Sequence, residues 1–185
     1  MPLITVEPPT SEPVTLDEIR AQCRLDDDMT DDDEPLKHYI SAAREYCEQH
    51  TGRHFAPKTL RWVGCAEYKI PLAANISNVH YVQYIDANET AQALSETSYY
   101  VDQYSLVGQL LILNPWPATS TKHPYPVEIE FDVGESECPL SVKQAILLLA
   151  AHWFENRESA AAGFTGKELG ETLQALLSPH RILHL

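Results

Sequence analysis

Two pairs of histidines stand four residues apart in this 185-residue sequence, a spacing at which two side chains on one helix can bind a metal ion. The pairs are His50 with His54 and His180 with His184. Gly52 lies inside the first pair and Pro179 directly precedes the second, so a regular helix is not expected through either pair. We therefore interpret these histidines as surface or partly buried residues, and we expect no metal ion and no other cofactor.

Motifs for nucleophilic, phosphate and calcium chemistry are all incomplete. The string at 134–138, Gly-Glu-Ser-Glu-Cys, lacks the closing glycine of a nucleophile elbow. The Gly-Lys pair at 166–167 is followed by glutamate and lacks the earlier glycine of a phosphate-binding loop. The acidic stretch 26–34 lacks the glycine and glutamate of a calcium loop, so we expect a solvated loop with its last acids near a helix N-terminus. The sequence predicts no catalytic residue, although a cytosolic hydrolase with a carboxylate pair or a histidine–metal site stays an alternative.

The charge balance restricts the partners that the protein can bind. There are 13 lysines and arginines against 27 aspartates and glutamates, a net charge of −14. A surface that grips nucleic-acid phosphates needs clustered basic residues, so this class is disfavoured, whereas a protein that lets nucleic acid pass without binding it is compatible. An acidic protein that binds a basic partner, in the manner of a nucleic-acid mimic, is a further alternative.

Length and composition are those of one globular domain, with 44% hydrophobic residues. No apolar run reaches the roughly 18 residues of a membrane span, and residues 1–9 lack the pattern of a secretory signal. Because no signal is visible, we expect the cysteines to be reduced and mostly buried. They are Cys23, Cys47, Cys65 and Cys138.

Hydrophobic periodicity and capping patterns predict four helices. Their ranges are 15–24, 35–51, 142–157 and 168–177. Capping-box patterns begin at Thr15 and Ser141. In the second helix an apolar stripe begins at Leu36, and Arg44 and Glu48 fall on the opposite, polar side.

Strands are predicted between the second and third helices, which makes the fold class α+β. Their ranges are 59–64, 67–72, 79–85, 99–103, 109–113 and 126–133. The last strand alternates strictly, so one face should be buried and the other should present Glu128, Glu130 and Asp132. Five tyrosines of this region are expected to pack in the core and between strands, because no basic residues surround them to attract bases. They are Tyr81, Tyr84, Tyr99, Tyr100 and Tyr104.

The third helix is apolar nearly all round. From Ala145 to Phe154 only His152 is not apolar, whereas a surface helix shows a polar half. This helix is too short to span a bilayer. We expect it to be central in its own domain and also to share surface with a neighbouring chain.

Three segments together resemble the head–tail connector proteins of tailed bacteriophages and prophages, also called adaptor or head-completion proteins. They are Val14–Arg20 followed by the acids at 31–33, Tyr39–Glu48 followed by Thr51-Gly52-Arg53, and Gln144–Leu149 followed by His152-Trp153-Phe154-Glu155-Asn156-Arg157-Glu158. The last of these strings is the most specific. The final helix and tail, 175–181, fit the same family, so the resemblance covers nearly the whole chain.

The resemblance implies a structural virion protein without catalysis. The implied fold is a small helical bundle of about four helices with a β-rich insertion at 59–133, inside a single connector domain at 15–178. An extended arm at 1–14 would precede this domain, and a docking tail at 179–185 would follow it. Another neck component, a stopper or tail terminator, is an alternative, but those proteins are richer in β structure.

The implied assembly is a homo-oligomeric ring of about twelve copies below the portal protein, at the head–tail junction of a virion built in the bacterial cytoplasm. The ring would extend the DNA channel and offer a platform for a stopper or tail-completion protein. Phage DNA would pass through without sequence-specific binding, because acidic walls repel its backbone. No membrane is involved in this assembly.

Candidate contact residues follow from the same reasoning. Trp153 and Phe154 could anchor a subunit interface, although packing in their own core is the favoured alternative. Arg157, with Glu155 and Glu158, could bridge between chains, or these charges could simply lie on the helix surface. The apolar, basic tail could dock against the portal, or it could fray or pack on its own subunit. Its residues are His180, Arg181, Ile182, Leu183, His184 and Leu185.

Overall fold

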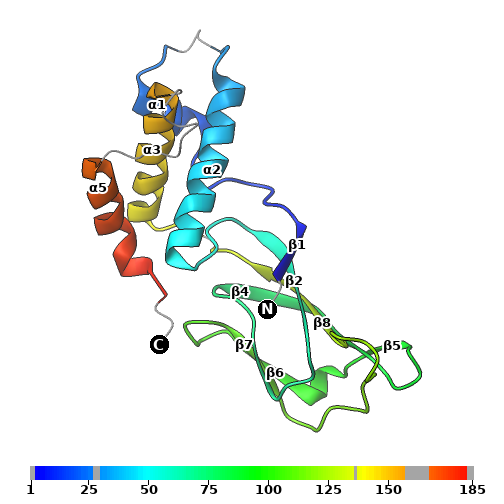
Figure 1. Cartoon of the computed structure of the whole chain (residues 1–185). Coiled ribbons are helices and arrows are strands. Elements are labelled where there is room, and N and C mark those ends of the chain that lie inside the picture. The colour runs from blue at the N-terminus through cyan, green and yellow to red at the C-terminus, as the bar shows by residue number, and fades with distance from the viewer. Residues whose placement is uncertain (1–2, 27–29, 136, 157–166, 183–185) are drawn as a thin grey trace. The chain divides into compact units, whose positions relative to one another are not determined.

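A computed structural model describes residues 3–26, 30–135, 137–156 and 167–182 of the chain (Figure 1). Contacts within the chain divide it into two compact units. One comprises Met1–Thr10 with Ala56–Glu135, and the other comprises Ser11–Phe55 with Ser136–Leu185. The expected division into an arm, one connector domain and a tail stays a prediction about which parts fold and act independently.

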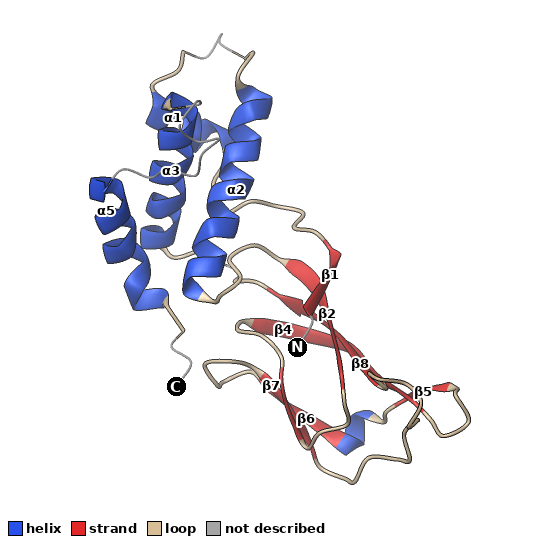
Figure 2. Ribbon diagram, viewed as in Figure 1, coloured by secondary structure: helices blue, strands red, loops and turns tan. Residues whose placement is uncertain are grey.

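The second unit is a bundle of helices (Figure 2). Its elements are α1 (Leu16–Cys23), α2 (Asp33–Thr51), α3 (Leu140–Glu155), α5 (Lys167–Leu177) and a short 3-10 helix, η2 (Ser178–His180). Helix α3 packs against α1, α2 and α5, so it is central in this unit, as its composition predicted. None of the described helices is both long and apolar enough to cross a membrane.

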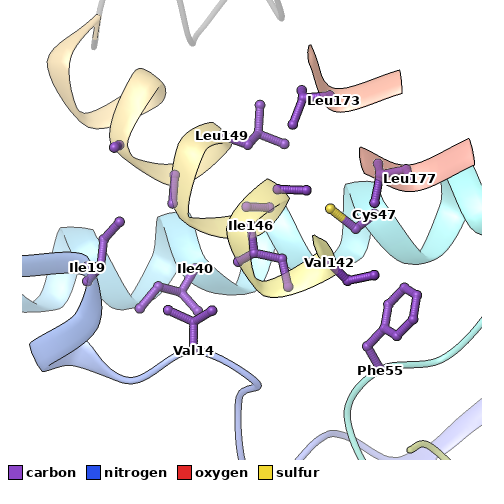
Figure 3. Packing of buried hydrophobic residues seen from close by; sticks show 14 of the residues in the cluster. Val14, Ile19, Ile40, Cys47, Phe55, Val142, Ile146, Leu149, Leu173 and Leu177 are labelled. Carbon is purple, nitrogen blue, oxygen red and sulfur yellow. The ribbon is translucent and has the colours of Figure 1, made fainter. Parts of the chain in front are cut away.

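Side chains from all four long helices meet in one buried cluster (Figure 3). Ile146 and Leu149 of α3 are completely buried there, as is Cys47 of α2. Removing one such leucine or isoleucine from a packed core costs about 3 kcal/mol, so this cluster supplies much of the stability of the helical unit. The half-buried Trp153 and Phe154 pack against the same cluster.

Helix termini follow their predicted caps in two places and differ in one. Thr15 forms the expected capping box with Glu18, and Gly52 ends α2 in the left-handed conformation with φ 74°. The capping box predicted at Ser141 is wrong, because the helix begins two residues earlier, with Pro139 at the N-cap and no side-chain cap. The Ser141 hydroxyl is instead hydrogen-bonded to Nε2 of His180 at 2.7 Å.

The first unit contains two antiparallel sheets (Figure 2). The five-stranded sheet has the order β1-β2-β8-β4-β5, and the three-stranded sheet has the order β3-β7-β6. The strands are β1 (Leu3–Glu7), β2 (Lys58–Gly64), β3 (Lys69–Pro71), β4 (Ile76–Ile85), β5 (Ala91–Ala93), β6 (Tyr99–Asp102), β7 (Gln109–Ile112) and β8 (Val127–Val133), and a 3-10 turn, η1 (Glu96–Ser98), precedes β6. One buried cluster contains side chains from both sheets, including Trp62, Phe131 and Leu110.

Two strands were missing from the sequence prediction. Leu3–Glu7, expected to be part of an extended arm, is extended but pairs with β2 as an edge strand. Ala91–Ala93 pairs with the end of β4. The strand predicted at 126–133 is confirmed, with Val127, Ile129, Phe131 and Val133 buried on one face.

Candidate assembly surfaces

The aromatic residues predicted at a subunit interface lie at the end of α3. Trp153 and Phe154 are half-buried against the core of the helical unit, and Glu155 is exposed. Nε1 of Trp153 is buried without a hydrogen-bond partner among the described residues. Arg157 and Glu158 lie outside the described residues. The structure thus shows that both aromatics contribute to their own core, and their role between subunits stays a prediction.

The first part of the predicted docking tail is attached to its own unit. Nε of Arg53 donates a hydrogen bond to the carbonyl oxygen of His180 at 2.8 Å, in addition to the side-chain bond between His180 and Ser141. The N–H of Ile182 donates to the carbonyl oxygen of Thr51 at 2.7 Å, and the Ile182 side chain is buried. His180 and Ile182 therefore help to hold the chain at the C-terminal end of α2.

The rest of the predicted docking tail consists of Arg181 and residues 183–185. Arg181 is exposed. Leu183, His184 and Leu185 lie outside the described residues. His180 and Ile182 are thus engaged within their own unit, and the role of the tail in docking stays a prediction.

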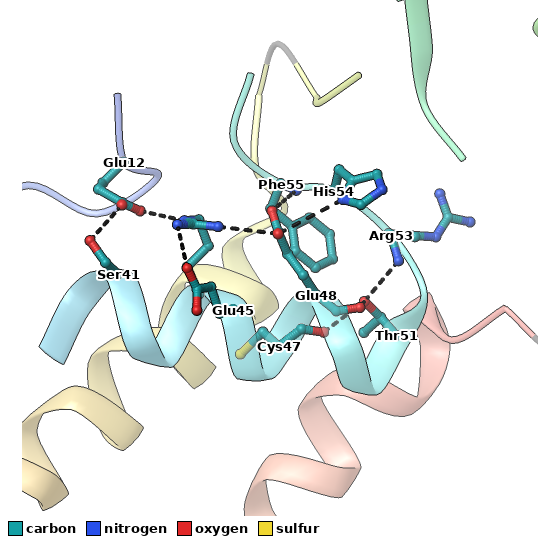
Figure 4. Close-up of polar contacts among 10 residues, drawn as sticks. Glu12, Ser41, Glu45, Cys47, Glu48, Thr51, Arg53, His54 and Phe55 are labelled. Atoms are coloured by element: carbon teal, nitrogen blue, oxygen red, sulfur yellow. Dashed lines mark hydrogen bonds and ion pairs between the residues drawn. The ribbon is translucent and has the colours of Figure 1, made fainter. Parts of the chain in front are cut away.

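A buried ionic network lies along α2 and was not expected from the sequence (Figure 4). Nε of Arg44 donates to Glu12 at 2.7 Å, and Nη1 of Arg44 donates to Glu48 at 3.1 Å. Glu12 also accepts a hydrogen bond from the Ser41 hydroxyl, and the N–H of Phe55 donates to Glu48 at 2.9 Å. Only 4% of the Arg44 side chain and 6% of the Glu48 side chain are exposed.

This network corrects the prediction that Arg44 and Glu48 lie on a polar, solvated side of α2. The segment around Glu12 and the segment that leads to Phe55 both cover this side of the helix. Buried charges are tolerated when each is paired and hydrogen-bonded, and here each carboxylate accepts bonds from more than one donor. The network ties the chain before α1 and the chain after α2 to one helix.

The outer face of β8 is acidic, as the alternation predicted. Arg61 lies between two of its carboxylates, 3.4 Å from Glu128 and 2.8 Å from Glu130. The Tyr81 hydroxyl donates to Glu128 at 2.5 Å, and its pKa is raised, first by burial and then by this bond, which holds the proton on the phenol. The pKa of Arg61 is also raised, chiefly by its hydrogen bond to Glu130.

The third carboxylate of this face, Asp132, has separate partners. It accepts a hydrogen bond from the Thr59 hydroxyl at 2.7 Å and lies 2.8 Å from Nε2 of His80. Three carboxylates therefore share one guanidinium and one imidazole, so the face is a polar network with an excess of acid.

The tyrosines of the β unit have three kinds of environment. Tyr84 and Tyr99 pack against the buried cluster, as predicted, and Tyr81 bonds to the acidic face. The packing prediction is wrong for Tyr100 and Tyr104, which are exposed. Tyr100 lies on the three-stranded sheet and Tyr104 lies in the connection between β6 and β7, where no element of the described chain covers it.

The described histidines and cysteines were compared with the arrangements that metal sites need. No group of three or more His, Cys, Asp or Glu residues in the described part of the chain could hold a metal ion. His50, His54 and His180 are half-buried, in line with the expected surface or partly buried positions, and His184 lies outside the described residues. All four cysteines are free, but the expectation that they are mostly buried is wrong for Cys65, which is exposed.

Comparison with known proteins identifies the family. The model of the head completion protein family matches residues 14–183. No protein with a curated description matches the sequence.

Solved structures share the fold. The chain resembles a protein in the neck of an empty gene transfer agent particle, computed with C6 symmetry, with a TM-score of 0.83 and 22% identity. It also resembles chains from the virion of the native gene transfer agent particle (TM-score 0.79, 24% identity) and from its neck computed with C12 symmetry (TM-score 0.75, 21% identity). Each match covers 100% of this chain and 97% of the other.

The family resemblance and the α+β class predicted from the sequence are thereby confirmed. The family match covers nearly the whole chain, and the fold match covers all of it. The chain belongs to the head completion protein family and is a structural protein of the head–tail connector.

Proposed function

We propose that copies of this chain form a closed ring in the neck of a virion, below the portal and above a stopper or tail-completion protein. The observation that carries this proposal is the family match over residues 14–183, joined to a fold shared with neck proteins that were solved with C6 and C12 symmetry. A ring of this kind uses head-to-tail contacts, so each subunit needs two different complementary surfaces.

The proposed ring acts by assembly and catalyses no reaction. The family is structural, and the buried charges of the helical unit are engaged with one another rather than directed into a cavity. Arg44 and Glu48 illustrate this point, because their hydrogen bonds hold segments of the chain in place.

Negative charge suits a conduit for DNA. The net charge of −14 disfavours attachment to phosphates, and the acidic face of β8 places Glu128 and Glu130 around one guanidinium, with Asp132 as a third carboxylate on the same face. A wall of this kind repels the DNA backbone and would let DNA slide during ejection, without reading its sequence.

The proposed contact with the portal has to be tested separately from the stability of the helical unit. Because His180 and Ile182 hold the end of the chain to α2, their removal would damage the helical unit as well as any docking surface. Deleting only residues 183–185 separates the two effects. Around the ring, Trp153, Phe154 and Glu155 remain the proposed contact residues, together with Arg157 and Glu158.

Co-sedimentation with the cognate portal ring tests this function. The full chain should sediment with the portal, and the variant that lacks 183–185 should bind at least tenfold more weakly while its thermal unfolding stays unchanged. The matched control is Gln174→Ala, an exposed change on α5 that should bind as the wild type does. Equal binding by the truncated chain would show that the tail is not the docking element, and no binding by the full chain would contradict the proposed function.

A further inference from the structure

Strand β1 is an edge strand whose apolar side chains are exposed on both faces. Leu3 pairs with Trp62 and therefore lies on the core side of the sheet, yet 43% of it is exposed. Ile4 pairs with Arg61 on the outer, acidic side, and 49% of it is exposed. A helix or loop packed on this strand would cover one face of the sheet. A strand added beside it would place its own side chains next to those of β1 on both faces.

The edge of β1 has little of the protection that edge strands usually carry. No lysine, arginine or proline lies within Leu3–Glu7, and its one charge is the last residue. A bulge between Thr5 and Glu7 interrupts only the end of the strand. The backbone groups on the free side of Leu3–Thr5 are thus available to another strand.

The opposite edge of the same sheet is only partly filled. Strand β5 pairs with Gln83–Ile85 of β4, and Leu94 continues this contact by donating its N–H to the Val82 carbonyl oxygen at 2.8 Å. On the side of β4 that faces away from β8, no strand of the described chain pairs with the stretch from Ser77 to Tyr81. At this edge a side-chain bond from Gln103 reaches the carbonyl oxygen of Ser77.

Strand directions allow these two edges to join in a ring. Each neighbouring pair in the order β1-β2-β8-β4 is antiparallel, so β1 and β4 run in opposite directions. A rotation about an axis roughly along the strands preserves strand direction, so β1 of a neighbouring copy would lie antiparallel to β4. A β1–β1 pair would instead produce a two-fold dimer.

We propose that β1 of one subunit adds to the open edge of β4 in the next, so that the five-stranded sheets continue around the ring. This inference rests on the proposed ring and names one of its subunit contacts. A second copy is the occupant because one sheet carries both halves of the contact, as a head-to-tail assembly requires. In register, Ile4, Arg61, Glu130 and Tyr81 form one row across the sheet, so Ile4 of the neighbour would lie beside the stretch that ends at Tyr81.

Disulfide cross-linking of assembled rings tests this contact. Ile4→Cys is combined with Asn78→Cys or with His80→Cys, both at exposed positions of β4, in a Cys65→Ser background that removes the exposed native thiol. Within one chain the two introduced thiols are three strand spacings apart, roughly 14 Å, too far for a disulfide. The matched control combines Ile4→Cys with Tyr100→Cys, an exposed position in the other sheet.

Portal-bound rings are oxidised for each cysteine pair. At least one of the two pairs that include a β4 position should give a ladder of dimers, trimers and larger covalent species, and the control pair should stay monomeric. Ile4→Lys should abolish ring formation and leave the circular dichroism of the free subunit unchanged. The inference is overturned if assembled rings give no covalent dimer with either cysteine pair on oxidation. It is also overturned if Ile4→Cys alone gives dimers through a β1–β1 contact, or if the Ile4→Cys thiol links to a different protein. Absence of a ring from the wild-type chain would instead contradict the proposed function.

Discussion

At the residue scale, Arg44 shows how burial changes the meaning of a charged side chain. Its position on α2 would suit a surface ion pair with Glu48, a pair that is usually worth well under about 1 kcal/mol. In the fold both side chains are almost fully buried, and Glu12 supplies a second carboxylate from another segment. Loss of one partner would leave an uncompensated charge in the interior, which is far more costly than loss of a surface pair.

Arg44→Ala should therefore lower the free energy of unfolding by about 3 kcal/mol. Urea denaturation followed by circular dichroism measures this change. Lys37→Ala is the control, because the ion pair of Lys37 with Glu34 is exposed and its loss should leave the midpoint nearly unchanged. Equal midpoints for the two variants would show that the network does not stabilise the helical unit.

The cysteines allow a test of burial that depends on pH. Burial raises the pKa of the Cys47 thiol to about 12, so it stays protonated and unreactive at pH 8, whereas Cys65 is exposed. A thiol reagent should label Cys65 rapidly and Cys47 only after unfolding, as mass spectrometry of the labelled peptides will show. Unfolding returns Cys47 to an ordinary pKa of about 8.5, so its contribution to stability is present below that pH and is lost as the pH rises toward 12. Fast labelling of Cys47 in the folded protein would contradict the structure.

At the element scale, two glycines have opposite roles in their elements. A Cβ atom at Gly64 would overlap Cη2 of Trp62, which is buried in the core of the β unit. A Cβ atom at Gly170 in α5 would meet no atom within 4 Å.

Gly64→Ala should consequently destabilise the protein by about 2 kcal/mol through overpacking. Gly170→Ala should stabilise it by about 0.8 kcal/mol, because alanine favours a helix over glycine. Chemical denaturation of both variants of the isolated subunit measures these shifts. A stable Gly64→Ala protein would mean that Trp62 does not occupy the described position.

The elements that sequence patterns predicted are those whose signals are local. Helices α2 and α3 follow from long apolar periodicities, and β8 follows from strict alternation. Strand β1 was missed because prolines surround it and its partner β2 is more than fifty positions away in the chain. The wrong cap at Ser141 has a similar cause, because His180 competes for that hydroxyl from a distant part of the sequence.

Sites are harder to predict than elements because exposure depends on tertiary contacts. The tail 180–185 is apolar and basic, yet only the fold reveals that Ile182 is buried and that the His180 carbonyl oxygen accepts a bond from Arg53. Likewise, no local pattern distinguishes the buried Arg44 from the exposed Lys37, since both are basic residues of the same helix.

At the scale of the whole molecule, the two units carry different parts of the proposed assembly. The helical unit contains the apolar core around α3 and the attached end of the chain, and the β unit contains the acidic face and two open sheet edges. In the ranges that the structure describes, neither unit contains a group of three or more His, Cys, Asp or Glu residues that could hold a metal ion. Assembly accounts for these features together, because interfaces need apolar and hydrogen-bonding edges and a DNA conduit needs acid.

Electron cryomicroscopy of the particle that contains this chain tests the central claim most directly. We predict a closed ring of this subunit between the portal and the tail, of about twelve copies if it follows portal symmetry. DNA would pass through its centre. A neck reconstruction at side-chain resolution that contains no density for this chain would contradict the account.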